Sequence, residues 1–102
     1  MTSKQRAYLK SLAMKLEPSF NIGKDSLTTG VVDAMIEALE ANELIKVGVL
    51  KNCMDDPREL AVLASERTHA EVVQVIGKKI VLYKQATKKE NRKIELPKAA
   101  NR

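Results

Sequence analysis

The sequence predicts one α/β domain in which a helix is followed by strand, helix, strand, helix, strand and strand. Apolar residues recur at helical spacing in three stretches, and shorter apolar or alternating stretches between and after them are typical of strands. Two strand–helix–strand units imply parallel neighbours joined by right-handed crossovers, and a closing hairpin adds an antiparallel pair. The 102 residues suffice for one domain and not for two. We therefore expect a four-stranded mixed sheet with helices packed on it.

The first helix should begin after Thr2 and run to about Leu16. Thr2 can cap it, with Gln5 as its partner in a capping box. Pro18 ends the helix, because the residue before a proline is driven out of the helical region. Residues Ser19 to Ile22 are then predicted to form a short first strand. Apolar residues at helical spacing give the expected buried stripe of the helix, at Leu9, Leu12, Ala13 and Leu16.

A second helix is predicted from about Leu27 to Asn42, with Thr28 as its N-cap and Asn42 as its C-cap. Its core face is expected at Val32, Met35, Ile36 and Leu39, with Glu37 and Glu40 toward solvent. In the next strand, Leu44 to Leu50, apolar residues alternate with Lys46 and Gly48. That alternation predicts a half-buried strand.

The third helix should span Pro57 to Thr68, because Asp56 can cap it and Glu59 can complete a capping box. Its inward side chains are expected at Leu60, Leu63 and Ala64. Strands are predicted at Glu71 to Ile76 and at Ile80 to Lys84, with a hairpin at residues 77–79 that uses Gly77. Residues 1–86 then form the domain. A basic tail at 87–102 should be partly mobile, with residues 93–97 docked on the domain.

Composition narrows the classes of partner. A net charge of +5 suggests a polyanion, either nucleic acid or an anionic membrane surface. The single cysteine, Cys53, rules out an internal disulfide and fits a reducing compartment. No apolar run reaches the roughly 20 residues of a membrane span, and the N-terminal residues carry no secretory signal. We expect a cytoplasmic protein.

The stretch from Ile22 to Thr28 joins the first strand to the second helix and carries a candidate phosphate site. Gly23 lets the backbone turn tightly and lets a ligand approach it. Lys24 places a cation at the turn, and unpaired N–H groups should lie just beyond the cap at Thr28. A glycine turn, a cation and a helix N-terminus together favour a phosphate. We therefore expect this loop to contact a nucleic-acid backbone.

Several segments, in this order and spacing, resemble the CRM domain (chloroplast RNA splicing and ribosome maturation), above all its stand-alone bacterial YhbY-type form. The matching segments are residues 2–9 (TSKQRAYL), 22–24 (IGK), 43–47 (ELIKV) and 75–77 (VIG) with 81–83 (VLY). The resemblance covers about residues 2–96. It implies an αβαβαββ fold similar to the C-terminal domain of bacterial translation initiation factor three. It also implies RNA binding through a GxxG loop and association with precursors of the large ribosomal subunit.

The chain departs from the family pattern at two places. Ser26 stands where the family's loop has its second glycine, and we expect serine to lack the freedom for a positive φ. Asp25 adds a negative charge beside the phosphate site, and a structural reason for both residues would be that one of them caps the helix. His69 follows the third helix where the family commonly has glycine. Histidine tolerates the left-handed conformation better than most residues, so we expect only a modest stability cost.

The predicted RNA-binding residues are the loop and the cations that could converge on it. They are Gly23, Lys24, Asp25, Ser26, Lys4, Arg6, Lys10, Lys78, Lys79 and Lys84. Four further cations, Lys88, Lys89, Arg92 and Lys93, either form a nonspecific electrostatic arm or keep the tail soluble. The aromatic side chains Tyr8, Phe20 and Tyr83 lie in apolar periodic segments. They are expected to pack rather than to stack on bases.

The reading from the residues and the resemblance is an RNA-binding protein that associates with ribosomal RNA in a precursor of the large subunit, as a monomer in isolation. No catalytic residue, cofactor or metal site is predicted. Cys53 and His69 could form a nucleophile pair, but no orienting third residue is evident, and they cannot supply four metal ligands. The alternative is a module that binds an acidic ribosomal or translation-factor protein. A weaker one is binding to anionic lipid.

Overall fold

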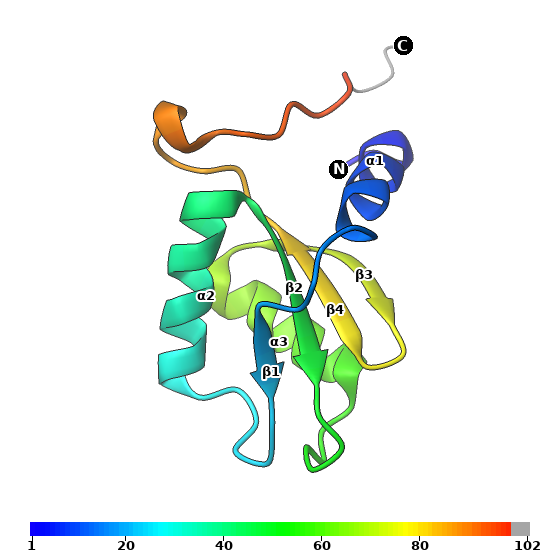
Figure 1. Cartoon of the computed structure of the whole chain (residues 1–102), viewed down its shortest axis with the longest axis vertical. Coiled ribbons are helices and arrows are strands. Elements are labelled where there is room, and N and C mark those ends of the chain that lie inside the picture. The colour runs from blue at the N-terminus through cyan, green and yellow to red at the C-terminus, as the bar shows by residue number, and fades with distance from the viewer. Residues whose placement is uncertain (99–102) are drawn as a thin grey trace.

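The computed structural model describes residues 1–98 and forms a four-stranded mixed sheet with helices on both faces (Figure 1). The elements, in chain order, are α1 (Ser3–Ala13), β1 (Phe20–Ile22), α2 (Thr29–Asn42), β2 (Leu44–Val49), α3 (Pro57–Thr68), β3 (Glu71–Ile76), β4 (Lys79–Tyr83) and a short 3-10 helix, η1 (Lys89–Asn91). This is the predicted αβαβαββ order, so the fold class is confirmed. Among the described residues, no helix is long and apolar enough to cross a membrane.

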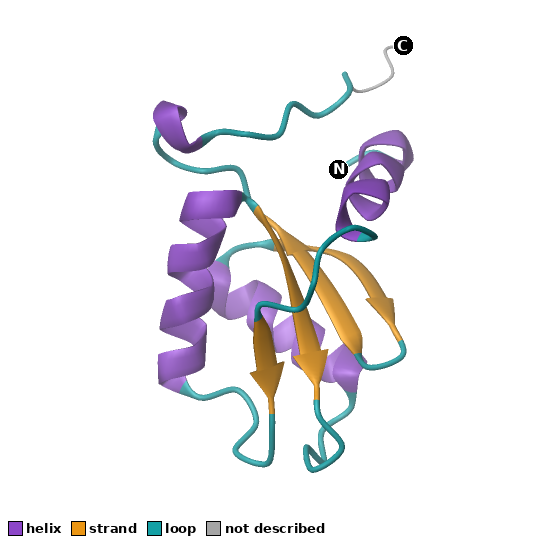
Figure 2. Ribbon diagram, viewed as in Figure 1, coloured by secondary structure: helices purple, strands orange, loops and turns teal. Residues whose placement is uncertain are grey.

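The sheet separates two apolar cores. On one face, α2 and α3 supply residues such as Met35, Leu39 and Leu60, which pack on Ile45 and Leu82 of the central strands. On the other face, α1 lies alone. Figure 2 shows the strands between α1 and the layer of α2 and α3. The smaller core under α1 consists of Leu9, Ala13, Leu44, Val73, Val81 and Tyr83. Alternate strand residues therefore serve different cores, as the pleat of a strand requires.

The strand order is β1-β2-β4-β3. The first crossover makes β1 and β2 parallel neighbours, as predicted. The second crossover does not make β2 and β3 neighbours, because β4 lies between them and pairs antiparallel with both. β3 thus runs in the direction of β2 without touching it as a neighbour. The prediction of a half-buried β2 is also wrong, since five of its six residues are buried. The reason is that the face carrying Lys46 and Gly48 is not open: Leu44 packs under α1, and Gly48 lies against Asn21 and Pro18.

Local signals placed most helix ends correctly. The capping box of α1 forms, with Gln5 N 3.1 Å from Thr2 Oγ1 and Thr2 N 3.0 Å from Gln5 Oε1. α3 begins and ends at the predicted residues, and His69 closes it at φ 61° and ψ 27°, in the left-handed region. The C-cap of α2, however, is Glu43 at φ 68° and not Asn42.

Some inward-facing residues were predicted wrongly. α1 ends at Ala13, three residues early, and Leu16 is 36% exposed. Ile36 and Leu63, at 40% and 41% exposed, face away from the core, while Ala61 is buried in α3.

Residues 85–98 form a segment that we call the strap, which crosses above the end of the sheet from α2 toward α1 (Figure 1). Its anchor is Glu43, whose side chain is fully buried. One carboxylate oxygen accepts the N–H of Ala86 at 2.9 Å, and the other accepts those of Lys93 and Ile94 at 2.7 and 2.8 Å. Beyond that anchor, Ile94 and Leu96 pack against the core under α1. Residues 99–102, at the end of the tail predicted to be mobile, lie outside the described residues.

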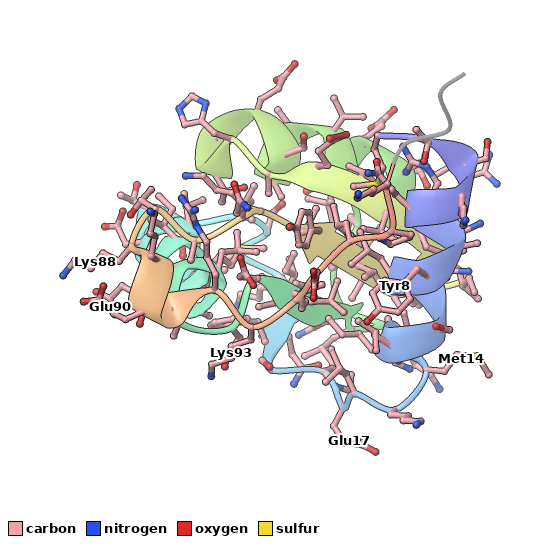
Figure 3. The ribbon with its side chains drawn as sticks, turned by 90° about the horizontal axis from the view of Figure 1, so that it is seen from above. Tyr8, Met14, Glu17, Lys88, Glu90 and Lys93 are labelled. Carbon is pink, nitrogen blue, oxygen red and sulfur yellow. The ribbon has the colours of Figure 1, made fainter. Side chains whose placement is uncertain are left out.

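Glu40, one turn before Glu43, holds the preceding part of the strap. Its carboxylate accepts hydrogen bonds from Thr87 N, Lys88 N and Asn91 Nδ2 at 2.9, 3.2 and 3.0 Å. The backbone N–H of Thr87, with the other donors of the strap, lowers the pKa of Glu40 to about 2. Burial of Glu43 raises its pKa, but the N–H groups of the strap outweigh this, so that pKa also lies below its usual value. Figure 3 shows Lys88 and Lys93 pointing outward from the strap.

These carboxylates predict an acid-sensitive strap. Because the folded-state pKa of Glu40 lies below the unfolded value of 4.5, its contribution to stability is complete above pH 4.5 and is lost as the pH falls toward about 2. We expect the urea midpoint of the wild type to fall between pH 6 and pH 3. Glu40→Gln should start lower at pH 6 and fall less. Equal pH dependence of the two proteins would contradict this assignment.

Candidate nucleic-acid interface

Three turns meet at one edge of the sheet, which we call the loop edge. β1, β2 and β3 run in the same direction, so the turns that follow them lie at the same end of the sheet. In Figure 1 the first two turns lie at the bottom of the molecule, and the turn between β3 and β4 lies higher, at the right. The three turns are residues 23–28, 50–56 and 77–78. The first two touch, since the Ser26 hydroxyl donates to Asp55 Oδ2, and Lys78 O of the third accepts from Val49 N at the end of β2 at 2.7 Å. The loop predicted to bind phosphate is therefore part of a larger surface.

The turn after β1 is built differently from the sequence-based expectation. Ser26 N donates to Gly23 O at 2.9 Å and closes a four-residue turn. The left-handed residue is Ser26, at φ 58°, while Gly23 does not have a positive φ. The expectation that serine could not adopt this conformation is wrong. A Cβ at Gly23 would meet Asn52 Oδ1 at 3.4 Å and Leu50 Cδ1 at 3.7 Å. Neither strain nor a clash demands a glycine there, and the side chains of Asn52 and Leu50 already lie beside it.

Two contacts brace this turn. The Ser26 hydroxyl donates to Asp55 Oδ2 of the next turn, which gives the left-handed serine a partner. Arg67 of α3 donates to Leu27 O at 3.3 Å, and the Leu27 side chain is buried in the larger core. Neither Asp25 nor Ser26 caps α2, contrary to the structural role considered for them. Their neighbour Thr28 does so, as predicted. The turn is therefore held by its surroundings rather than by a second glycine.

The N-terminus of α2 is open. Thr28 Oγ1 accepts from Val31 N at 3.2 Å, but within residues 1–98 no hydrogen bond takes up the N–H groups of Thr29 or Gly30. Residues 28–30 are exposed, the first turn holds no acid, and a Cβ at Gly30 would meet nothing within 4 Å. Free N–H groups at a helix N-terminus attract anions. With Lys24 exposed on the preceding turn, this end of α2 suits a phosphate.

The predicted cations divide between the two ends of the sheet. Lys24 and Lys78 lie at the loop edge, and Lys79 begins β4 beside it. Lys84 lies at the opposite edge, where its N–H donates to Glu43 O at 2.9 Å. Lys4 lies near that opposite edge too, because the α1 N-terminus reaches Glu71 at the start of β3, 4.0 Å from the Met1 amino group.

Arg6 and Lys10, the other two predicted cations of α1, have different surroundings. The Arg6 guanidinium donates to the carbonyls of Val72 and Val73, the latter at 3.2 Å, where the pairing of β3 with β4 is irregular. That contact attaches α1 to the sheet. Lys10 is exposed in the last turn of α1.

Two cations at the loop edge were not among the predicted site residues. Lys51 is exposed in the turn after β2, and Arg58 is exposed at the start of α3. The sequence could have indicated them, because parallel neighbouring strands such as β1 and β2 end side by side, so the turns that follow the two strands lie together. Two acids of this edge have structural partners: Asp55 accepts from Ser26, and Asp56 caps α3. Asp25 is exposed beside Lys24.

The remaining candidates are placed as follows. Tyr83 is buried and Phe20 half-buried, as expected, whereas Tyr8 is 39% exposed on α1 (Figure 3). Cys53 is buried before α3 and His69 follows that helix, whose 12 residues span roughly 18 Å. The two cannot form a nucleophile pair.

Comparison with known proteins identifies relatives over almost the whole chain. The CRS1 / YhbY (CRM) domain model matches residues 1–84. The chain is 44% identical over 97 residues to a Bacillus subtilis protein named "Probable RNA-binding protein YqeI", covering 95% of this chain and 99% of the relative. It is 39% identical to a Haemophilus influenzae protein named "RNA-binding protein", covering 95% of both. The solution structure of SAV1595 from Staphylococcus aureus superimposes with a TM-score of 0.77 at 48% identity, covering 95% of this chain and 99% of that one.

Proposed function

The chain belongs to the CRS1/YhbY (CRM) domain family, and we propose that it binds RNA at the loop edge. The observation that carries the proposal is the open N-terminus of α2, where no hydrogen bond within residues 1–98 takes up the N–H groups of Thr29 and Gly30, beginning five residues after the exposed Lys24. A phosphate there accepts main-chain hydrogen bonds and is paired by the Lys24 ammonium. Relatives named as RNA-binding support the same partner. We further propose that the RNA is ribosomal, within a precursor of the large subunit, and that the protein acts in the cytoplasm as a monomer.

Backbone recognition makes the proposal testable by salt. Each phosphate neutralised by a lysine or arginine contributes roughly −0.7 to −0.9 to the slope of log K against log salt. The loop edge offers Lys24, Lys51, Arg58 and Lys78. We therefore expect a slope of roughly −3 to −4 for a fragment of precursor ribosomal RNA, measured by fluorescence anisotropy. An affinity that does not change with salt would overturn the proposal.

Lys24→Ala tests the turn itself. Because Lys24 is exposed, the substitution should leave the melting temperature unchanged. RNA affinity should fall severalfold, since one phosphate loses its cation. Lys89→Ala is the matched control: it removes the same charge from η1, at the other end of the sheet. If the two variants bind equally well, the turn is not part of the site.

The partner class is tested in a lysate. A tagged chain should recover ribosomal RNA, and nuclease treatment should release the proteins recovered with it. A complex that survives complete RNA digestion would favour the alternative, a direct contact with an acidic ribosomal or translation-factor protein. Crosslinking followed by mapping of the contacted nucleotides identifies the RNA element.

A further inference from the structure

The face of the sheet beside α1 holds a pocket that lies apart from the open end of α2. Where α1 ends, a hollow of about 120 Å³ opens over β2, β4 and β3. Its floor is formed by Ala13 and Val81, both nearly fully buried. The strand register places Lys46, Val81 and Gln74 in one row and Lys79 and Ile76 in the next, on the same face.

The rim of this pocket exposes apolar surface. Met14 is 81% exposed and Ile76 is 59% exposed. Figure 3 shows Met14 pointing outward at the end of α1. Two large apolar side chains that flank a hollow with an apolar floor fit a ligand with an apolar surface of its own. Methionine suits such a place because its thioether is flexible and polarizable, so it can adapt to a flat ring.

The polar groups of the rim favour a ligand that carries negative charge. Lys46 and Lys79 are two of the seven residues that line the pocket, and none of the seven is acidic. Gln74 adds a primary amide, which can donate and accept hydrogen bonds at once. A nucleotide has an apolar face, a hydrogen-bonding edge and flanking negative charge, and it therefore fits this lining. Its base must be unpaired, because a base within a duplex has its edge paired and its faces stacked.

We propose that this pocket takes one unpaired base of the RNA held at the loop edge. Met14 and Ile76 cover the faces of the base, Gln74 reads its edge, and Lys46 and Lys79 pair with the flanking phosphates. The proposal rests on the proposed function. The two sites lie within reach of one strand, since Lys46 is three residues from Val49 at the end of β2, roughly 10 Å along the sheet. Lys79 immediately follows the turn at residues 77–78.

The first test maps both sites at once by NMR. A single-stranded RNA of about eight nucleotides is titrated into the ¹⁵N,¹³C-labelled protein, and a blunt RNA duplex serves as the comparison. We expect the single strand to shift the Gln74 side-chain amide and the Ile76 and Val81 methyl groups together with the Lys24 amide. The duplex should shift only the Lys24 region. If the single strand moves Lys24 and leaves the pocket signals unchanged, the pocket proposal is wrong and the proposed function stands. If neither region moves, both fall.

The second test separates charge from base contact. Lys46→Ala should reduce the steepness of the salt dependence on the single strand by about 0.7, the value for one contact, and leave duplex binding unchanged. Gln74→Leu should keep that slope. It should lower the affinity for the strand severalfold, yet leave unchanged the affinity for an abasic strand of equal length. Lys89→Ala again serves as the charge control. Equal losses on the normal and abasic strands for Gln74→Leu would overturn base contact.

Discussion

Glu43→Ala is expected to lower the free energy of unfolding by about 3 kcal/mol, which corresponds to a fall of roughly 12 to 24 °C in the melting temperature. The Glu43 carboxylate is the acceptor for the N–H groups of Ala86, Lys93 and Ile94. Each buried donor left without a partner costs about 1 to 3 kcal/mol. Because the strap can partly detach and expose these N–H groups to water, the total loss of stability should be well below three times the largest of these costs. Urea unfolding checks the free energy, and hydrogen exchange should show faster exchange at Lys93 and Ile94.

Two further variants show what causes the loss of stability in Glu43→Ala. Glu43→Gly removes the same carboxylate but relieves the left-handed backbone at φ 68°, so it should be about 1 kcal/mol more stable than Glu43→Ala. Glu37→Ala removes an exposed carboxylate from the same helix and should change stability by no more than about 0.5 kcal/mol. A Glu43→Ala protein with the same melting temperature as the wild type would show that the strap does not depend on this carboxylate.

Gly30→Glu is expected to move stability and RNA binding in opposite directions. Glycine within a helix costs about 0.5 to 1 kcal/mol relative to other residues, and an acid in the first turn interacts favourably with the helix dipole. A Cβ at position 30 meets nothing within 4 Å, so thermal unfolding should show a more stable protein. The new carboxylate would occupy the place of the phosphate. RNA affinity should therefore fall by about tenfold or more, equivalent to at least 1.4 kcal/mol.

Gly30→Gln is the matched control, because glutamine has nearly the same size and no charge. It should gain helix stability and lose less RNA affinity than Gly30→Glu. If the two variants bind RNA equally weakly, the size of the new side chain and not its charge lowers the affinity. The RNA backbone then needs the space that the glycine leaves open. A Gly30→Glu protein that binds RNA like the wild type would remove the N-terminus of α2 from the interface.

Local chemistry explains which predictions succeeded. The Thr2–Gln5 capping box, the Thr28 cap and the Asp56-Pro57 start of α3 involve groups within three residues of one another, so their geometry is already specified along the chain. The same reasoning placed β3 at its observed limits. The phosphate site at this turn and the α2 N-terminus stays a prediction from the same local signals, because a glycine, a lysine and a capping threonine are neighbours in sequence.

The errors arose where a residue's partner is distant in the chain. Ser26 adopts a positive φ beside Asp55, 29 residues away, and Arg6 binds the carbonyl of Val72, 66 residues away. The pairing of β4 between β2 and β3 separates two strands that were expected to be neighbours. For the same reason, the sequence could list the lysines and could not sort them between the two ends of the sheet.

The sequence by itself determined the order and type of the helices and strands, the N-caps of the three α-helices and the family, because these depend on periodicity and on contacts within a few residues. Only the tertiary structure decided that Lys24, Lys51 and Lys78 share an edge and that Lys84 lies at the other. It also decided that Glu43 is a buried anchor rather than a surface acid. The physical reason is that strand order and the docking of α1 and the strap bring together groups whose separation along the chain carries no local signal.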